Sequence, residues 1–306
     1  MRILFDNINF NSRSGPNSFG KKLRDGLLKL DHDVRDSFAT GENPDVSLSF
    51  IINQKPTMPN VLRLDGIYFN TSQDFNALND PIRRSYIAAD AVVFQSKFNQ
   101  HLSERYFGSV ENTYIIGNGV DINYVQSVRP IENKLLDKFS DVWCCASSWR
   151  PHKRLKDNIE YFLSVAPNDT CLIIAGSNPD HVIKNERIMY TGDIPHDILL
   201  SIYRRSSTFI HLAWLDHCPN VVVDARAAGC KIICSDSGGT KEIAGHNATL
   251  LKESVEWAFN PIALYSPPDL DFSRTVQNTI ASSIEIETVA EKYLNVFSET
   301  IKRVQK

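Results

Sequence analysis

The sequence lacks the features that mark several common classes of protein. Its 306 residues include six cysteines, but no two of them form a C-x-x-C pair, so neither a zinc site nor a disulfide framework is predicted. No apolar run approaches the roughly 20 residues that cross a bilayer. A net charge of −3, from 33 basic and 36 acidic residues, gives no strong signal for nucleic acid or an anionic membrane as a partner.

The amino-terminal segment also lacks the marks of a signal peptide. MRILFDNINF reads as a β-strand, without the basic start, apolar core and cleavage site of a secretory leader. Most cysteines lie in apolar runs such as VWCCAS, where a thiol behaves as a small hydrophobic group. We therefore expect a reducing, cytoplasmic location and no transmembrane segment.

The chain instead contains an alternation of short apolar runs and longer segments with helical period. Several runs are apolar almost throughout, as expected of parallel strands that are buried on both faces. Strands are predicted at residues 2–8, 45–52, 60–66, 91–96, 113–119, 142–147, 170–176, 187–193, 208–214 and 231–237, and helices at about 17–30, 97–107, 155–166, 197–206 and 220–229.

This alternation predicts an α/β fold with two Rossmann-like, doubly wound parallel-sheet lobes. A length of 306 residues favours two domains over one. The polar stretch from Val125 to Asp141 is the expected boundary, which gives domains at 1–125 and 140–272. Residues 273–306 are expected to form two tail helices. The second carries an apolar stripe that needs a partner surface, so we expect the tail to pack back on the first domain.

Two acidic residues in the second half lie eight positions apart. Asp216 falls in the loop after the strand at 208–214, and Asp224 falls early in the helix at 220–229. A buried helix start at the carboxyl edge of a parallel sheet is an anion site. The alternative is an ordinary helix with Asn220 as its N-cap and two incidental aspartates. The residues expected at the helix start are Cys218, Pro219, Asn220 and Val221.

The segment LDHCPNVVVD, followed by SGGTKEI and preceded by TGDIPHDILLSIYRRSSTFIHL, resembles the signature of the retaining GT-B glycosyltransferases of family 4. That signature has two acidic residues separated by seven others, usually both Glu. Aspartate at the second position is shorter by one methylene. The resemblance implies a nucleotide-sugar donor in the second lobe, with Asp216 contacting the sugar and Asp224 the ribose. It implies that Gly192 and Ile194 lie beside the base and that His217 lines the site.

SSWRPHKRLKDNIEYF resembles the start of the donor lobe of the same family, where an arginine and a lysine bind the diphosphate. Lys153 matches the family lysine. The usual arginine position is Ser148 here, and Arg150 is the expected substitute. Two cations suit two phosphates by charge and by the geometry of the guanidinium group. The alternative is a solvated basic loop, since Arg154 and Lys156 follow.

Two residues of the first half are candidates for the acceptor side. SRSGPNSFGKKL resembles the family's first loop and helix, which implies that the backbone at Gly15 approaches the diphosphate or the acceptor. Gly15 is equally explained as a turn before Pro16 at a helix start. Asp65 ends a predicted strand, where it would orient or deprotonate an acceptor hydroxyl. Family members often have a histidine near this place, and Asp65-Gly66 is also an ordinary turn.

No metal and no cofactor is predicted. Asp31-His32-Asp33 has the form of a D-x-D metal motif, but it follows a helix and precedes a strand, so we expect a turn. The remaining histidines of the second half have no spacing that distinguishes them. The prediction is a retaining, metal-independent hexosyltransferase that moves a sugar from a nucleotide-diphosphate sugar to a hydroxyl of a glycan, a lipid-linked sugar or another acceptor, including a modified nucleobase.

Two other functions fit parts of the pattern. A non-catalytic nucleotide or sugar binder on the same fold would explain the departures at Ser148 and Asp224. A dinucleotide-dependent oxidoreductase would also alternate strands and helices. Its G-x-G-x-x-G turn is missing after the first strand, and no acidic residue ends the next strand in the expected way.

Overall fold

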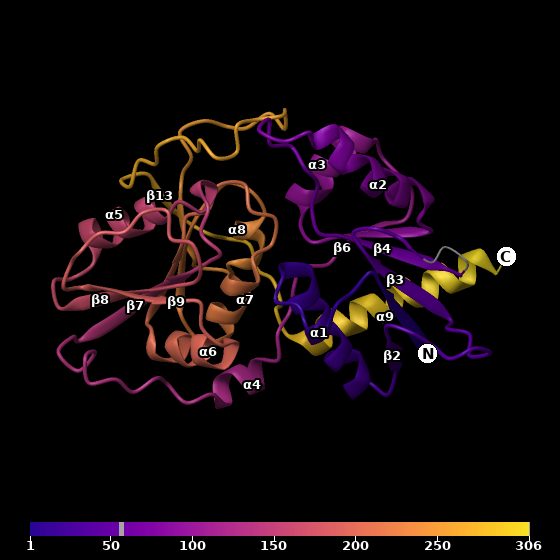
Figure 1. Ribbon diagram of the computed structural model, residues 1–306, viewed down its shortest axis with the longest axis horizontal. Helices are drawn as coiled ribbons and strands as arrows, with labels where there is room; N and C mark the ends of the chain where they lie inside the picture. The colour runs from indigo at the N-terminus through magenta and orange to yellow at the C-terminus, as the bar shows by residue number, and fades with distance from the viewer. Residues whose placement is uncertain (55–57, 306) are drawn as a thin grey trace. The chain divides into compact units, whose positions relative to one another are not determined.

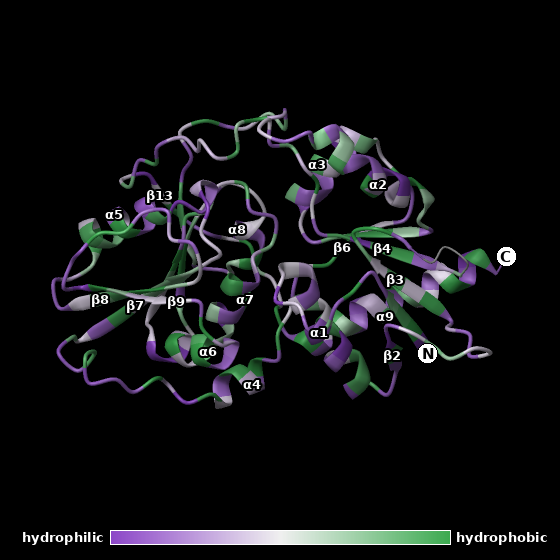
Figure 2. Ribbon diagram, viewed as in Figure 1, coloured by the Kyte–Doolittle hydropathy of each residue, from purple (hydrophilic) through white to green (hydrophobic). Residues whose placement is uncertain are grey.

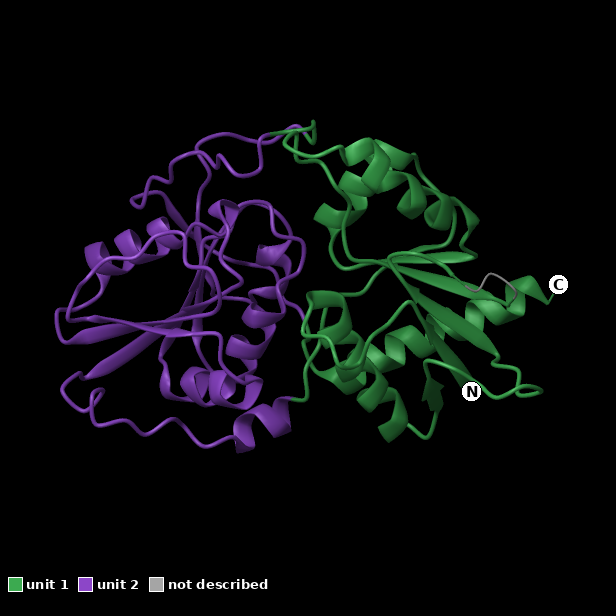
Figure 3. Ribbon diagram, viewed as in Figure 1, with its two compact units in different colours: residues 1–121, 259–262, 283–306 green, residues 122–258, 263–282 purple. Residues whose placement is uncertain are grey.

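The protein is divided into two compact units, each with its own β-sheet (Figure 3). The computed structural model describes residues 1–54 and 58–305. The first unit contains residues 1–121, 259–262 and 283–306, and the second contains 122–258 and 263–282. The predicted fold class, two α/β lobes with parallel sheets, is confirmed.

The first unit is built on a six-stranded sheet of order β2-β1-β3-β4-β5-β6, in which all neighbours are parallel. Helices cover both of its faces, with α1 and α9 on one and α2 and α3 on the other (Figure 1). The elements are β1 (Arg2–Asp6), α1 (Gly15–Lys29), β2 (Asp33–Arg35), β3 (Val46–Phe50), β4 (Asn60–Leu64), α2 (Phe75–Ala88), β5 (Ala91–Phe94), α3 (Lys97–Phe107), β6 (Thr113–Ile115) and α9 (Ile286–Val304).

The tail contains one helix rather than the two expected. The apolar stripe of α9, with Val289, Tyr293 and Phe297, is buried in the same core as Phe19 and Leu23 of α1. The expected first tail helix is wrong, because Thr275–Gln277 forms a strand, β13, that pairs antiparallel with β12 (Thr249–Leu251). Residues 273–282 therefore lie with the second unit, and the chain re-enters the first unit at residue 283.

The second unit has a seven-stranded sheet of order β13-β12-β11-β10-β7-β8-β9, in which only β13 runs antiparallel. Its strands are mainly hydrophobic, whereas helices such as α6 show both kinds of residue (Figure 2). The elements are α4 (Ile122–Ser127), β7 (Asp141–Ala146), α5 (Leu155–Val165), β8 (Thr170–Ala175), β9 (Ile188–Gly192), α6 (His196–Arg205), β10 (Thr208–His211), α7 (Asn220–Ala227), β11 (Lys231–Ser235), α8 (Thr240–Ile243), β12 (Thr249–Leu251) and β13.

The division between the units lies at 121/122, a few residues before the expected 125. The reason is α4, which begins before the polar stretch, packs against α6 and α7 and so belongs to the second unit. Among the helices of residues 1–54 and 58–305, none has both the length and the apolar character that spanning a bilayer requires.

Each sheet has one place where the strand order reverses. In the first sheet β1 lies between β2 and β3, and in the second β7 lies between β8 and β10. At such a place the loops after two neighbouring strands leave toward opposite faces. Doubly wound sheets bind their ligands there, outside the carboxyl ends of the strands. These loops follow β1 and β3 in the first unit, and β7 and β10 in the second.

Candidate active site

A lysine and an aspartate meet where the strand order of the second sheet reverses. Lys153 ends a short 3₁₀ turn (Pro151–Lys153) after β7, and Asp216 lies in the loop after β10. Nζ of Lys153 is 2.5 Å from Oδ2 of Asp216, and Nε2 of His211 is 3.0 Å from the same oxygen. The backbone N–H of Trp214 donates to the carbonyl of His152 at 2.7 Å, which ties the two loops together.

The charges of this cluster follow from burial and pairing. Burial alone would raise the pKa of Asp216, but the Lys153 ammonium and the His211 hydrogen bond outweigh it and hold the pKa well below its usual range. Burial lowers the pKa of His211 despite the carboxylate beside it, so the neutral ring donates from Nε2. The backbone N–H of His217 donates to Oδ1 at 3.0 Å. A carboxylate oxygen accepts about two hydrogen bonds, which leaves Oδ1 with one acceptor direction for a ligand hydroxyl.

The glycine-rich loop after β11 supports the backbone of Asp216. The N–H of Gly239 donates to the carbonyl of Asp216 at 2.8 Å. Gly238 has a φ of +67°, and a Cβ there would meet the backbone of Asp216. Because only glycine combines this conformation with this close approach, the SGGTKEI segment acts as a rigid support for the aspartate.

The helix after Asp216 begins without a capping side chain. Pro219 is the N-cap residue of α7 and Asn220 is its first helical residue, so the alternative in which Asn220 caps the helix is wrong. Cys218 and Pro219 are buried, while Asn220 and Val221 are half-buried. A helix start with no side-chain acceptor can receive an anion on its N–H groups.

Asp224 is paired with a histidine that the sequence did not single out. Its carboxylate lies on the second turn of α7 and is 4% exposed. Nε2 of His196, the first residue of α6, is 3.0 Å from Oδ2 of Asp224. The two aspartates of the motif thus each contact a histidine, Asp216 with His211 and Asp224 with His196. No spacing rule predicts these pairs. The only local signal is Pro195, which marks the start of α6 and so places His196 on its first turn.

The basic loop is not uniformly solvated. Arg150 is exposed, and its side chain forms no hydrogen bond or ion pair with the part of the chain that the structure describes. Arg154 is 2% exposed, and its guanidinium forms a bidentate ion pair with Glu253, at 2.7 and 3.0 Å. It also donates to the carbonyl of Pro268 at 2.7 Å. Arg154 is therefore a structural residue, and only Arg150, Lys153 and Lys156 present charge at the surface of this loop.

A cavity of about 210 Å³ lies at the carboxyl ends of β8 and β9. Trp149 and Tyr190 line it, together with Gly176 and Gly192. Gly176 has a φ of +114°, and a Cβ there would meet the backbone of Ser147. The N–H of Gly176 donates to the carbonyl of Gly192 at 2.8 Å. Ile194 is half-buried two residues further along. The rings and the bare glycine backbone suit a flat aromatic ligand.

The first-unit candidates, Gly15 and Asp65, have different surroundings. Gly15 is exposed at the first position of α1, directly before Pro16. The carboxylate of Asp65 forms an ion pair with the buried Arg63 and accepts a hydrogen bond from Gln95. Burial raises the pKa of Asp65, although Arg63 opposes the shift. These contacts favour a structural role for Asp65 over the predicted catalytic one.

The Asp31-His32-Asp33 segment forms the expected turn and leads into β2. Nδ1 of His32 is 3.0 Å from the terminal amine of Met1, and Asp33 forms an ion pair with Arg35 at 2.8 Å. Within residues 1–54 and 58–305, no group of three or more histidine, cysteine, aspartate or glutamate side chains is arranged to hold a metal ion.

Comparison with known proteins agrees with this architecture. Residues 140–265 match the family model of the glycosyl transferases group 1. AviGT4, a glycosyltransferase involved in avilamycin A biosynthesis, is similar in structure, with a TM-score of 0.63, 12% identity and coverage of 99% of this chain and 98% of that one. Alr3699/HepE of Anabaena, in complex with UDP and glucose, has a TM-score of 0.62, 14% identity and coverage of 98% and 100%. No curated protein matches the chain by sequence.

Sucrose-phosphate synthase of Thermosynechococcus elongatus is also similar, with a TM-score of 0.63, 11% identity and coverage of 100% and 94%. The two doubly wound sheets and these likenesses define a GT-B fold. The match to the glycosyl transferases group 1 covers residues 140–265, which contain Lys153, Asp216 and Asp224. The chain is thus a glycosyltransferase.

Proposed function

We propose that the protein is a retaining, metal-independent glycosyltransferase of the family 4 type that uses a nucleotide-diphosphate sugar. The observation that carries the proposal is the Lys153–Asp216 pair beside the uncapped start of α7. It supplies a cation, a carboxylate with one open acceptor direction, and backbone N–H groups at one carboxyl edge of the sheet. A diphosphate and the sugar attached to it need these three kinds of group.

In this proposal the donor lies along the carboxyl edge of the second sheet. Its diphosphate lies on the N–H groups at the start of α7 and is bound by Lys153 and Arg150. Charge-assisted bonds to phosphate are the strongest hydrogen bonds in proteins. These fixed charges stabilise the nucleoside diphosphate as it leaves, which is usually the largest contribution to such catalysis.

Different residues bind the nucleoside and the sugar of the donor. The base occupies the cavity lined by Trp149 and Tyr190, with Gly192 and Ile194 at its edge. Asp224 contacts the ribose and Asp216 contacts a sugar hydroxyl through Oδ1. Because Oδ2 of Asp224 is bonded to His196, a ribose hydroxyl that reaches this oxygen must share it with the imidazole or displace the ring.

The transfer step needs no side-chain nucleophile. The acceptor oxygen forms a bond to the anomeric carbon on the face from which the diphosphate departs. The bond from that carbon to the phosphate oxygen breaks, and its electron pair leaves with the nucleoside diphosphate. The acceptor proton passes to a phosphate oxygen of the leaving group. Attack on the departing face retains the anomeric configuration.

A thermal-shift panel tests the donor proposal. UDP, GDP and ADP and their sugars are added to the purified protein in EDTA and, separately, in Mg²⁺. A ligand that binds only the folded state raises the melting temperature. We expect at least one nucleoside diphosphate to stabilise the protein in EDTA. Stabilisation that appears only with Mg²⁺ contradicts the metal-free site, and no stabilisation by any nucleotide contradicts the donor site.

The alternative, a non-catalytic nucleotide or sugar binder, draws on the burial of Asp224 behind His196 and on Ser148 at the usual arginine position. Release of nucleoside diphosphate from a stabilising donor, with or without added sugar acceptors, separates the two. We expect release of the nucleoside diphosphate.

We also propose a cytoplasmic location, since the six cysteines are all described, all buried and not joined by disulfides.

A further inference from the structure

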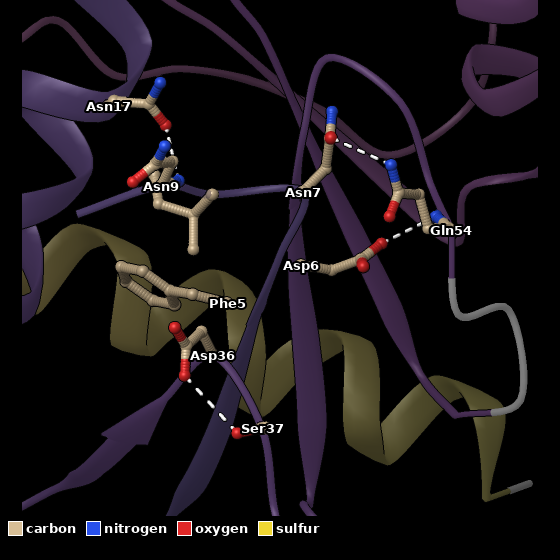
Figure 4. A pocket seen from close by; sticks show the side chains of 9 residues that line it. Phe5, Asp6, Asn7, Asn9, Asn17, Asp36, Ser37 and Gln54 are labelled. Carbon is tan, nitrogen blue, oxygen red and sulfur yellow. Dashed lines mark hydrogen bonds between the residues drawn. The ribbon is translucent and has the colours of Figure 1, made fainter. Parts of the chain in front are cut away.

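A second polar pocket lies in the first unit, where the strand order of its sheet reverses. It has a volume of about 470 Å³ and lies at the carboxyl ends of β1 and β3. That volume is within the range of roughly 300–1,000 Å³ of small-molecule sites. Seven of its nine lining residues are polar (Figure 4). They include two carboxylates, Asp6 and Asp36, and four carboxamides, Asn7, Asn9, Asn17 and Gln54.

Asp6 is the most buried polar group of this pocket. It is 2% exposed, and two donors share its Oδ2 atom: the hydroxyl of Ser49 at 3.0 Å and the backbone N–H of Gln54 at 2.6 Å. Its Oδ1 atom receives no hydrogen bond from residues 1–54 or 58–305. A hydroxyl of a bound molecule in the pocket would supply a donor.

The carboxamides are held in place before any ligand binds. Asn7 has a φ of +56°, and its Nδ2 donates to the carbonyl of Phe50 at 2.7 Å. Its Oδ1 accepts from Nε2 of Gln54 at 2.9 Å (Figure 4). On the other side, Oδ1 of Asn17 accepts from the backbone N–H of Asn9 at 2.8 Å. Fixed polar groups lose little entropy when a ligand binds.

The chemistry of the pocket favours an uncharged ligand with many hydroxyls. None of the described residues that line it is basic. The carboxylate of Asp6, whose hydrogen-bond donors are a hydroxyl and a backbone N–H, would repel a phosphate or another anion. Carboxamides both donate and accept, as hydroxyls do. Asp36 directly follows β2, a short strand that lies outside the predicted ones. Such a residue binds sugar hydroxyls in dinucleotide enzymes, but here no glycine-rich phosphate turn accompanies it.

We propose that this pocket binds an uncharged, polyhydroxylated ring of the acceptor, with Asp6 and Asp36 accepting hydrogen bonds from its hydroxyls. This inference deepens the proposed glycosyltransferase function. It rests on that function in one respect, the identification of the bound ring as part of the acceptor. The binding of a neutral sugar ring to the first unit stands on the pocket alone. The acceptor class is then a carbohydrate without charge on the bound ring.

Saturation-transfer NMR tests the proposal with named probes. The methyl glycosides of glucose, galactose, mannose and N-acetylglucosamine are titrated into the whole protein, and glucose 6-phosphate and galactose 1-phosphate form the anionic arm. We expect transfer to the ring protons of at least one neutral glycoside. Its Kd should rise at least fivefold in Asp6→Asn and in Asp36→Asn, and the phosphorylated sugars should bind more weakly. Asp25→Asn removes an exposed carboxylate from α1 and should leave the Kd unchanged.

Three results overturn the proposal: no transfer to any neutral glycoside, an unchanged Kd in both pocket variants, or tighter binding of the phosphorylated sugars. Asp36 is exposed, so its substitution should not disturb folding. If Asp6→Asn does not fold, the Kd of Asp36→Asn alone tests the proposal. Nucleoside diphosphate stabilisation is measured on the same variants. If it stays at the wild-type value while sugar binding is lost, the pocket is independent of the donor site. If wild type shows no nucleotide stabilisation but binds the glycoside, the donor proposal fails and this one stands.

Discussion

Asp216 and Asp224 have the same side chain but opposite surroundings. The carboxylate of Asp216 is 14% exposed and touches a lysine and a histidine. Asp224 is 5% exposed at its side chain and lies behind His196. Asp216 therefore holds a cation in place and still has an open acceptor direction, whereas Asp224 reaches a ligand only beside its imidazole partner. The two roles proposed for them can be separated by mutation.

We expect Asp224→Asn to weaken nucleoside diphosphate and donor alike, because both carry the ribose; the loss appears mainly in KM. Asp216→Asn keeps a side-chain oxygen that can accept from Lys153, so nucleoside diphosphate affinity should stay within about threefold of wild type. The substitution should lower kcat, because contacts to the sugar matter most as it distorts toward the transition state. Calorimetry gives the Kd of the nucleoside diphosphate for each variant, and a turnover assay gives the kcat and KM of each variant for the donor. Loss of nucleotide binding in Asp216→Asn, or none in Asp224→Asn, contradicts the assignment.

The candidate site was only partly predictable at this scale. The motif spacing and the resemblance name Lys153, Asp216 and Asp224, because their order along the chain is tied to strand ends and helix starts. His196 and His211 were missed, since each contacts its aspartate through tertiary packing rather than through sequence spacing. Arg154 and Lys156 look alike in the sequence, and only the position of Glu253 in the fold separates the buried residue from the exposed one.

At the scale of elements, the long apolar strands were predictable and the short or polar elements were not. β5, β8 and β11 contain runs of apolar residues, so burial is visible in their composition. The helix α2 was missed because its buried face includes Asn79 and Ser85, its exposed face includes Leu78 and Ile87, and Pro81 lies inside it. β13 was expected to be helical, and its strand conformation depends on pairing with β12, which no local pattern shows.

Arg154 connects three elements, and its removal should destabilise the second unit. Its guanidinium joins the start of α5 to Glu253, which follows β12, and to Pro268. Arg154→Ala leaves the Glu253 carboxylate, 7% exposed, without its partner. Breaking a buried ion pair in this way costs about 3–5 kcal/mol. Urea unfolding should show this loss. Lys156→Ala, at a side chain 61% exposed, should change stability by less than about 0.5 kcal/mol.

A loss below about 1 kcal/mol in the free energy of unfolding of Arg154→Ala would mean that the Arg154–Glu253 ion pair contributes little to stability. The fold would then tolerate Glu253 without its partner. In that case Arg154 would no longer be set apart from the solvated part of the basic loop. Because the substitution acts on folding, its effect on turnover is interpreted only after the folded fraction has been measured.

At the scale of the whole molecule, the chain builds two doubly wound sheets, and each has a different chemistry where its strand order reverses. The second unit places a lysine, an exposed arginine and an uncapped helix start there. The first unit places two carboxylates and four carboxamides there. This contrast supports the proposals that the second unit binds the charged donor and the first an uncharged acceptor. The sequence predicted both sheets but not the pocket of the first unit.

Buried histidines predict how the stability of the molecule depends on pH. Burial, reinforced by Lys153, lowers the pKa of His152 to about 3, against about 6.5 in the unfolded chain. The unfolded state therefore binds the extra proton first, and stability falls as pH falls below about 6.5. At pH 5 this amounts to about 2 kcal/mol. Urea unfolding at pH 7 and pH 5 measures the stability lost on acidification. This loss should be about 2 kcal/mol smaller in His152→Gln than in wild type.

The exposed His246 provides the matched control, since solvent surrounds it in both states. His246→Gln should lose as much stability on acidification as wild type. Burial also lowers the pKa of His217, to about 4, so part of the loss persists in His152→Gln. An identical pH dependence in wild type and His152→Gln would contradict the burial of that imidazole in a neutral form.

The central claim is that Lys153 and Arg150 bind the donor diphosphate without a metal ion, and one titration tests it most directly. The nucleoside diphosphate that stabilises the protein is titrated in EDTA into wild type, Lys153→Ala, Arg150→Ala and Lys156→Ala. Charge-assisted bonds to phosphate contribute about 1.5–3 kcal/mol each. The account predicts that Kd rises by about one to two orders of magnitude in the first two variants and stays within about threefold of wild type in Lys156→Ala. Equal losses in all three variants, or no binding by wild type in EDTA, would contradict it.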